Sequence, residues 1–185
     1  MMPPMNGSRS NQSDLPPNHP VRVFMEEHAT LAGFLDELEQ ASVDAGKTVA
    51  GLEPKGARRS ALANLASNLL DAEPHHQREE QALFPRMEEA GVEGPPHVMR
   101  MEHDHLRAAK HALEDHAKGT APVDAAWVQR LVQLADTIVG TLRAHIHKEN
   151  EILYPMALQV VDAEGWAAIT ADCERIGPCV FSRAR

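Results

Sequence analysis

Apolar residues recur every three or four positions along most of the chain, which is the spacing of one buried face of an α-helix. The clearest stripe predicts a first helix from about Pro20 to Ala45–Gly46, where glycine provides a stop signal. Similar stripes predict helices over about 57–90, 96–118, 123–160 and 163–175, separated by glycine and proline. The members of the first stripe are Phe24, His28, Leu31, Leu35 and Leu38. We therefore expect an all-α protein.

Four long helices joined by short loops favour an up-down-up-down four-helix bundle, here with a short extra C-terminal helix. We expect a disordered segment over 1–18, the bundle over 19–160, and a short helix and tail that pack on it over 161–185. Pro74 predicts a bend or a break in the second helix. Pro85 and Pro155 predict a matching bend or loosening in the second and fourth helices.

Composition and charge narrow the class of protein. Aromatic residues make up only 4% of the chain, which suits a helical core of leucine, alanine, valine and methionine. A net charge of −9 argues against a nucleic-acid partner, and no apolar run of about 18 residues is long enough to span a membrane. The polar, proline-rich start lacks the apolar stretch of a signal peptide, so we expect a cytoplasmic protein. Cys173 and Cys179 fit neither a disulfide framework nor a redox motif and are expected to be ordinary buried or tail thiols.

Several of the histidines belong to a motif that occurs twice in the sequence. His75 and Glu79 lie four residues apart on one helix face, and the same pair recurs 70 positions later as His145 and Glu149. Each pair is followed by leucine, an aromatic residue and proline at matching positions. The preceding helices also match, because Glu27-His28 corresponds to Glu102-His103. The bundle is therefore predicted to consist of two similar helical hairpins related by an approximate two-fold axis.

These positions predict a metal centre inside the bundle. Four imidazoles and two carboxylates exceed what one structural zinc ion takes, and they suit a pair of iron or manganese ions with bridging carboxylates and terminal histidines. Six protein ligands leave coordination positions open, and open positions imply chemistry or the binding of a small ligand. The expected metal ligands are His28, His75, Glu79, His103, His145 and Glu149.

Some neighbouring residues compete for these roles. His76 with Glu80 and His147 with Glu151 have the same four-residue spacing, but their Leu-aromatic-Pro segments do not coincide under the shift of 71 that relates them. Glu80 is instead a candidate for orienting a ligand from outside the centre. His105 is an alternative to His103, although its different helix face favours exposure. Three further histidines, His97, His111 and His116, are expected at the surface or in loops, and Phe84 and Tyr154 are expected to be packing residues.

The two rows ending in Leu-Phe-Pro and Leu-Tyr-Pro, with Glu-His in the preceding helices, resemble the hemerythrin-like HHE cation-binding domain family over roughly residues 19 to 158. The resemblance implies a four-helix bundle that holds two non-haem iron ions, bridged by Glu79, Glu149 and an oxo or hydroxo group. It also implies that the four histidines are terminal ligands.

One position departs from the oxygen-carrying members of that family. They place a second histidine four residues after the one on the third helix, where this chain has Arg107. The pattern is closer to bacterial iron–sulfur repair proteins and iron-sensing domains of the same family. The cysteine-bearing N-terminal domain that is typical of the repair proteins is not seen in the sequence, so repair activity stays an alternative.

The expected function is a di-iron module that binds oxygen, nitric oxide or iron itself for sensing, storage or buffering. An alternative is a di-iron redox enzyme, namely a peroxidase, an oxidase or a repair protein, because open positions also support O–O chemistry. A third alternative is a regulatory interaction protein that responds to iron and uses residues 162–185 for its interaction. The expected partners are small ligands (oxygen, nitric oxide or peroxide), with neither nucleic acid nor membrane.

Overall fold

The computed structural model describes residues 14–182 of the chain, and every regular element in that range is a helix. The first helical column is α1 (Pro20–Lys47) and the third is α5 (Gly94–Lys118). The second is built from α2 (Ala57–Leu70), α3 (Glu73–Arg78), η2 (Glu79–Leu83) and α4 (Phe84–Glu89). The fourth is built from α6 (Ala125–Lys148), η3 (Glu149–Leu153) and α7 (Tyr154–Val160), and α8 (Ala163–Ile176) and η4 (Val180–Ser182) follow it. The prediction of an all-α protein is confirmed for these residues.

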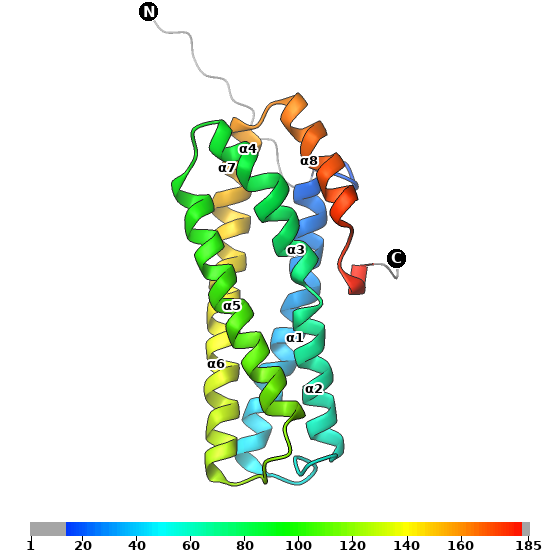
Figure 1. The fold of residues 1–185 in the computed structure, drawn as a ribbon, viewed down its shortest axis with the longest axis vertical. Helices are drawn as coiled ribbons and strands as arrows, with labels where there is room; N and C mark the ends of the chain where they lie inside the picture. The colour runs from blue at the N-terminus through cyan, green and yellow to red at the C-terminus, as the bar shows by residue number, and fades with distance from the viewer. Residues whose placement is uncertain (1–13, 183–185) are drawn as a thin grey trace, which may run out of the picture.

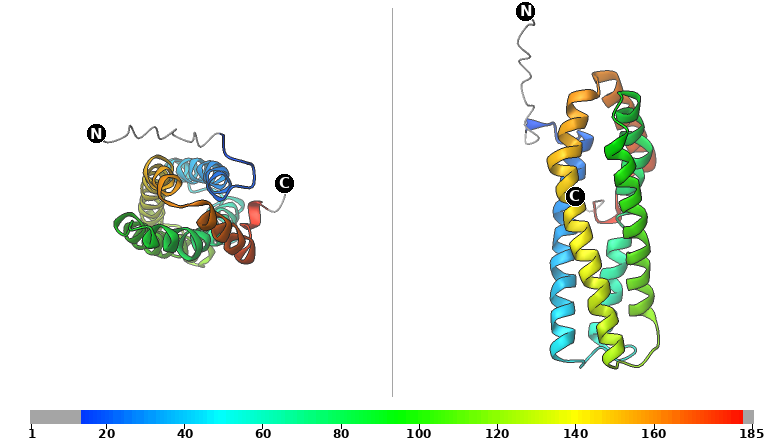
Figure 2. Two further views of the ribbon diagram at one scale, coloured as in Figure 1. Left: turned by 90° about the horizontal axis from the view of Figure 1, so that it is seen from above. Right: turned by 90° about the vertical axis from the view of Figure 1, so that its left-hand side faces the viewer.

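The columns lie side by side along the long axis of the molecule, and successive columns run in opposite directions in Figure 1. Contacts join α1 to α6, α6 to α5, α5 to α2 and α2 to α1, so the columns enclose one common interior. The view from above in Figure 2 shows this ring, with α8 added outside the second column. Side chains that point inward from all four columns can therefore meet.

Local sequence signals explain where the helices begin and break. Nδ1 of His19 accepts a hydrogen bond from the backbone N–H of Val21, and Pro20 fits the first turn of α1 because it needs no donor there. At Pro74 the helix is broken and restarted: α2 ends at Leu70, and α3 begins at Glu73 with the proline in its first turn. This outcome is one of the two that the position of Pro74 predicted.

The loosening predicted at Pro85 and Pro155 takes the form of two π-helical turns. The N–H of Phe84 bonds to the carbonyl of Glu79, and the N–H of Tyr154 bonds to the carbonyl of Glu149, five residues back in each case. A proline cannot donate to the preceding turn, and the wider turn absorbs this defect before the α-helix resumes. Each π turn begins at one of the two predicted carboxylate ligands.

Two apolar clusters fill the interior, with the predicted site between them along the helices. One extends through Leu31, Leu65, Leu106 and Leu142 toward the end of the bundle that holds the 48–56 loop. The other contains Phe24, Leu83, Phe84, Tyr154 and Ile169 at the opposite end. The polar layer at positions 27–28, 75–79, 103 and 145–149 is thus closed above and below by apolar side chains, and little water reaches it.

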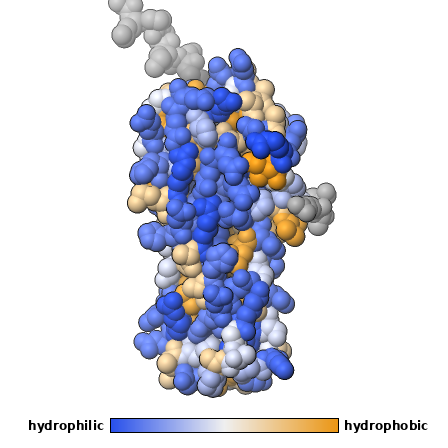
Figure 3. All heavy atoms as spheres, in the orientation of Figure 1, coloured by the Kyte–Doolittle hydropathy of each residue, from blue (hydrophilic) through white to orange (hydrophobic). Residues whose placement is uncertain are grey.

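The C-terminal helix α8 packs on η2, α3 and α1. Ile169 is buried in this contact. Of the segment predicted to be disordered, residues 1–13 lie outside the described residues, and so do residues 183–185 of the tail. The face shown in Figure 3 is largely hydrophilic, with small apolar patches. Within residues 14–182, no helix is both long enough and apolar enough to cross a bilayer.

Candidate metal centre

All six predicted ligands point into the interior of the bundle from different columns. His28 comes from α1, His75 from α3 and His103 from α5, while His145 is near the end of α6. Glu79 and Glu149 open the two π turns. Each of the six side chains is no more than 3% exposed. The structure therefore brings together every residue that the duplicated motif singled out.

The histidines meet in two pairs through their Nε2 atoms. Nε2 of His28 lies 3.0 Å from Nε2 of His75, and the His103 and His145 Nε2 atoms are also 3.0 Å apart. Each pair combines one histidine from the first helix of a hairpin with one from the second helix of the same hairpin. This arrangement gives two adjacent nitrogen-rich sites, one for each half of the sequence repeat.

The two carboxylates lie between the pairs and connect them. Glu149 places Oε2 3.1 Å from Nε2 of His28 and Oε1 2.8 Å from Nε2 of His145. Oε2 of Glu79 is 3.5 Å from Nε2 of His75 and 3.4 Å from Nε2 of His103. Each carboxylate thus faces one imidazole of each pair, which is the placement that a bridging ligand needs.

The outer nitrogens of His75 and His145 are held in the same way. Nδ1 of His75 lies 2.8 Å from Glu27, and Nδ1 of His145 lies 2.8 Å from Glu102. Each of these carboxylates is also paired with a cation three residues after the histidine: Arg78 contacts both oxygens of Glu27 at 2.7 Å, and Lys148 contacts Glu102. The first pair is buried, whereas Lys148 and Glu102 are 37% and 22% exposed.

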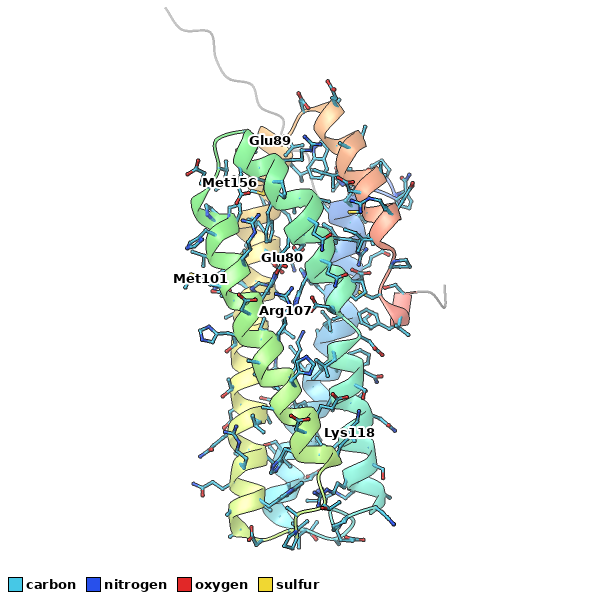
Figure 4. All side chains as sticks on the ribbon, viewed as in Figure 1. Glu80, Glu89, Met101, Arg107, Lys118 and Met156 are labelled. Carbon is cyan, nitrogen blue, oxygen red and sulfur yellow. The ribbon has the colours of Figure 1, made fainter. Side chains whose placement is uncertain are left out.

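The outer nitrogens of the other two histidines also face oxygen atoms. Nδ1 of His28 lies 2.9 Å from Oδ1 of Asn150, and Nδ1 of His103 lies 2.7 Å from Oε1 of Glu80. Glu80, the candidate for orienting a ligand from outside the centre, makes the second of these contacts. Figure 4 shows Glu80 beside Arg107 at mid-height of the bundle, where the guanidinium is 2.9 Å from Glu80 and 3.0 Å from Glu73. Arg107 therefore lies in the outer layer, bound to carboxylates.

This arrangement determines which nitrogen of each ring faces the centre as a free base. Because all four Nδ1 atoms face acceptor oxygens, Nδ1 carries the proton in the neutral ring and Nε2 turns its lone pair inward. Lone pairs that face each other and a carboxylate repel unless a cation or proton lies among them. Consistent with this, Oε2 of Glu79 and both oxygens of Glu149 accept no hydrogen bond although they are buried. Donors of this kind fit divalent metal ions.

Charge coupling in the metal-free centre is strong. Burial opposes charge on Glu149, but His145, His103 and His28 outweigh it and hold the pKa of this carboxyl well below its ordinary value. Burial likewise opposes protonation of His103, yet Glu149, Glu79 and Glu80 raise its pKa to about 11. Protons thus balance the carboxylates when no metal does so. A bound divalent ion would replace them.

Tyr154 does more than the packing predicted for it. Its hydroxyl donates to Oε1 of Glu79 at 2.8 Å, and its ring stacks on that of His28 with centroids 5.8 Å apart. Burial together with the charges of Glu79 and Glu149 raises the pKa of Tyr154 well above its ordinary value, so the phenol remains a donor. Its counterpart 70 positions earlier, Phe84, has no hydroxyl and only packs.

Most of the competing histidines lie away from the centre. His105 and His147 are exposed, as are His97 and His111. His116 was expected at the surface or in a loop, but it is half-buried on α5, and its ring stacks on Trp127 with centroids 4.4 Å apart. His76 differs from all of these because it is buried against the centre, and burial lowers its pKa well below the ordinary value.

Several residues that shape the site were not assigned from the sequence. The repeat already paired Glu27 with Glu102, and the position directly before each first-helix histidine was the available signal for their orienting role. Arg78 and Lys148 also follow the shift of 70. Asn150 and Tyr154 carried no such signal, since their counterparts Glu80 and Phe84 are different residue types.

The C-terminal segment completes one half of the outer layer. Ser182 donates to Oε1 of Glu27 at 3.0 Å, and the buried Cys179 sulfur accepts from Arg78 at 3.5 Å. Both cysteines are free thiols, and burial raises the pKa of Cys173 to about 11 and that of Cys179 to about 12. They are therefore protonated thiols near neutral pH, in line with the ordinary thiols predicted.

Comparison with known proteins places this geometry in a family. The chain is 30% identical over 107 residues to iron-sulfur cluster repair protein YtfE from Yersinia pseudotuberculosis, and equally to the protein of that name from Yersinia pestis. Each alignment covers 55% of this chain and 48% of the relative, so the chain spans about half the length of the curated relatives it matches. The family model of the hemerythrin HHE cation binding domain matches residues 19–157, and the chain therefore belongs to the hemerythrin HHE cation-binding family.

Proposed function

We propose that this protein holds a non-haem di-iron centre in an up-down-up-down four-helix bundle and uses it to bind a small ligand, namely oxygen, nitric oxide or peroxide. His28 and His75 would hold one ion, His103 and His145 the other, and Glu79 and Glu149 would bridge them. When bound, the irons supply Lewis-acid and redox chemistry at positions left open by the protein ligands. Binding of a small ligand at these positions would serve sensing, storage or buffering.

The observation that carries the proposal is the anchoring of all four imidazoles. Every Nδ1 faces an acceptor oxygen, so four Nε2 lone pairs converge on two carboxylates with three unpartnered oxygens. Such a constellation is electrostatically unfavourable without cations and is favourable with two. None of the six side chains is more than 3% exposed, which suits a small ligand over a large substrate at the centre.

Metal analysis of freshly purified protein, read with its optical spectrum before and after oxygen and azide, tests the proposal. We expect two irons per chain and oxo-bridge charge-transfer bands. His103→Gln and Glu149→Gln should lose iron and bands, whereas the matched exposed variants His105→Gln and Glu151→Gln should keep both. An iron-free protein, or one tightly held zinc ion, would contradict the proposal.

A second candidate is redox or repair-like activity, which the similarity to YtfE favours. It predicts multiple turnovers with peroxide, or restored activity of an iron–sulfur enzyme damaged by nitric oxide. Simple ligand binding predicts a stoichiometric adduct without turnover. Measuring both with the same iron-loaded sample separates the two functions.

A further inference from the structure

A fifth histidine, His76, is buried directly against the centre. It lies on α3 next to His75, is 1% exposed, and provides none of the contacts that anchor Nδ1 of the other four rings. Its ring stacks on that of His103, with centroids 4.0 Å apart and planes inclined by 13°. Its centroid is 6.3 Å from that of His145 in an edge-on arrangement. His76 is thus packed against both histidines of the second pair.

Packing alone does not explain a histidine at this position. The sequence repeat places Ile146 at the equivalent position of the other hairpin, and Ile146 packs against the apolar core. An apolar side chain therefore satisfies this location in the bundle. An imidazole costs free energy there, because its Nδ1 is buried without a hydrogen-bond partner.

The ring lies close to the second histidine pair, where binding to a metal ion would offset the cost of its burial. A ligand atom of His76 and those of His103 and His145 all lie within 4.8 Å of one another. The bound nitrogens of two imidazoles on one ion lie about 3 Å apart at metal–nitrogen distances of ~2.1 Å. To join the pair, His76 would therefore have to move inward by up to about 2 Å. Its ring would also have to turn out of the stack on His103, because the lone pair of an imidazole nitrogen lies in the plane of the ring.

Unlike the other four rings, His76 is not held in place by a hydrogen bond on Nδ1. Its Nδ1 lies 3.7 Å from Oε2 of Glu73, which is too long for a hydrogen bond. Glu73 is itself held by the guanidinium of Arg107 at 3.0 Å. The other four imidazoles are each fixed by a contact of 2.9 Å or less on Nδ1. A shift of His76 breaks no comparable bond.

We propose that His76 is a third imidazole ligand of the ion held by His103 and His145, so that the two halves of the centre carry unequal numbers of nitrogens. The inference rests on the proposed di-iron function. It makes the site asymmetric at a position where the repeat has an apolar residue, Ile146, in one half and a candidate metal ligand, His76, in the other.

The test is a count of ligated imidazoles in the iron-loaded, reduced full-length protein by proton NMR with histidine-selective ¹⁵N labelling. A ring N–H of an iron-bound imidazole shifts far outside the normal range through the metal–nitrogen bond, whereas a ring that only stacks does not. We expect five strongly shifted ring N–H signals, from His28, His75, His76, His103 and His145. This measurement needs no variant.

His76→Ile, which installs the residue found at the equivalent position, should remove one of the five signals and weaken binding of one iron by at least about 10-fold. His105→Gln, an exposed change on α5, is the matched control and should alter neither. Five signals in the wild type would support the proposal even if His76→Ile failed to fold.

The outcomes also separate this inference from the proposed function. Two irons with only four shifted signals, or an unchanged count in folded His76→Ile, would overturn the role of His76 and leave the di-iron centre standing. Failure of the wild type to load two irons would overturn both.

Discussion

The hydroxyl of Tyr154, in the fourth helical column, donates a hydrogen bond of 2.8 Å to Oε1 of Glu79 in the second. The bond links the two halves of the sequence repeat directly at a proposed bridging carboxylate. It is also asymmetric, because Phe84 takes the place of tyrosine in the other half and leaves both Glu149 oxygens without a hydrogen bond.

Tyr154→Phe should therefore keep the fold and weaken the centre. The ring still fills its place, as Phe84 does in the equivalent position, but Oε1 of Glu79 loses its donor. We expect iron affinity to fall by about 10- to 100-fold, the usual effect of removing an outer partner of a ligand. Competition with a calibrated chelator measures this, with helix content by circular dichroism as the control. Unchanged affinity would show that the bond does not position Glu79.

Glu27→Gln and Glu102→Gln form a matched pair, since both remove a charge beside a ligand histidine. Glu27→Gln leaves the buried Arg78 without its counter-ion and should cost about 3–5 kcal/mol of the free energy of unfolding. Glu102→Gln acts on a partly exposed pair and should cost ~1 kcal/mol or less. Urea unfolding of the metal-free proteins tests the order. Equal losses would contradict a dominant role for burial.

The acid dependence of stability follows from the same carboxylate. Burial alone would raise the pKa of Glu27, but His75 and Arg78 lower it from 4.5 to about 2. A carboxyl whose pKa is lower in the folded than in the unfolded state stabilises the folded protein. This stabilisation is complete above the unfolded-state pKa and is lost as the pH falls through the folded-state pKa. The stability difference between wild type and Glu27→Gln should therefore be constant above about pH 5 and shrink by ~3 kcal/mol toward pH 2. A difference independent of pH would refute this assignment.

Metal loading should release protons. Burial opposes charge on His103, but its carboxylate neighbours raise its pKa to about 11, so the ring is protonated in the metal-free protein at pH 7. A ligand imidazole must be neutral, and the proton leaves when iron binds. A pH-stat titration with ferrous iron should record at least about one proton released per chain. The Glu80→Gln variant, which removes a carboxylate that stabilises the proton but is not one of the six proposed ligands, should release fewer.

Removal of residues 162–185 should destabilise the protein and weaken iron binding. The segment covers the second column through α8, buries Ile169, and donates to Glu27 through Ser182. If the segment served only a regulatory interaction, iron binding would survive the deletion. Thermal unfolding and iron content of the truncated protein decide between the two, and Ser182→Ala, which removes one hydrogen bond, should cost only about 1 kcal/mol.

Periodicity and repetition in the sequence were enough for the helices and for the six inward residues. An apolar stripe must be buried, so it determines which helix face points inward. His28 and His145 lie in such stripes, and their side chains must therefore also point inward. The shift of 70 between His75 and His145 singled out two pairs that are fully buried, and it set them apart from the overlapping His76–Glu80 and His147–Glu151 spacings. These are properties of a single helix and can be read along the chain.

Contacts between columns could not be read in this way. Asn150 against His28, Glu80 against His103, and Ser182 against Glu27 join residues far apart in the sequence, and each depends on how the helices rotate and pack. The burial of His76 is a further case, because the stacking that buries it comes from α5 and not from its own helix. Helical period fixes the direction of a side chain relative to its own axis, whereas hydrogen-bond partners and depth of burial are set by the neighbouring helices.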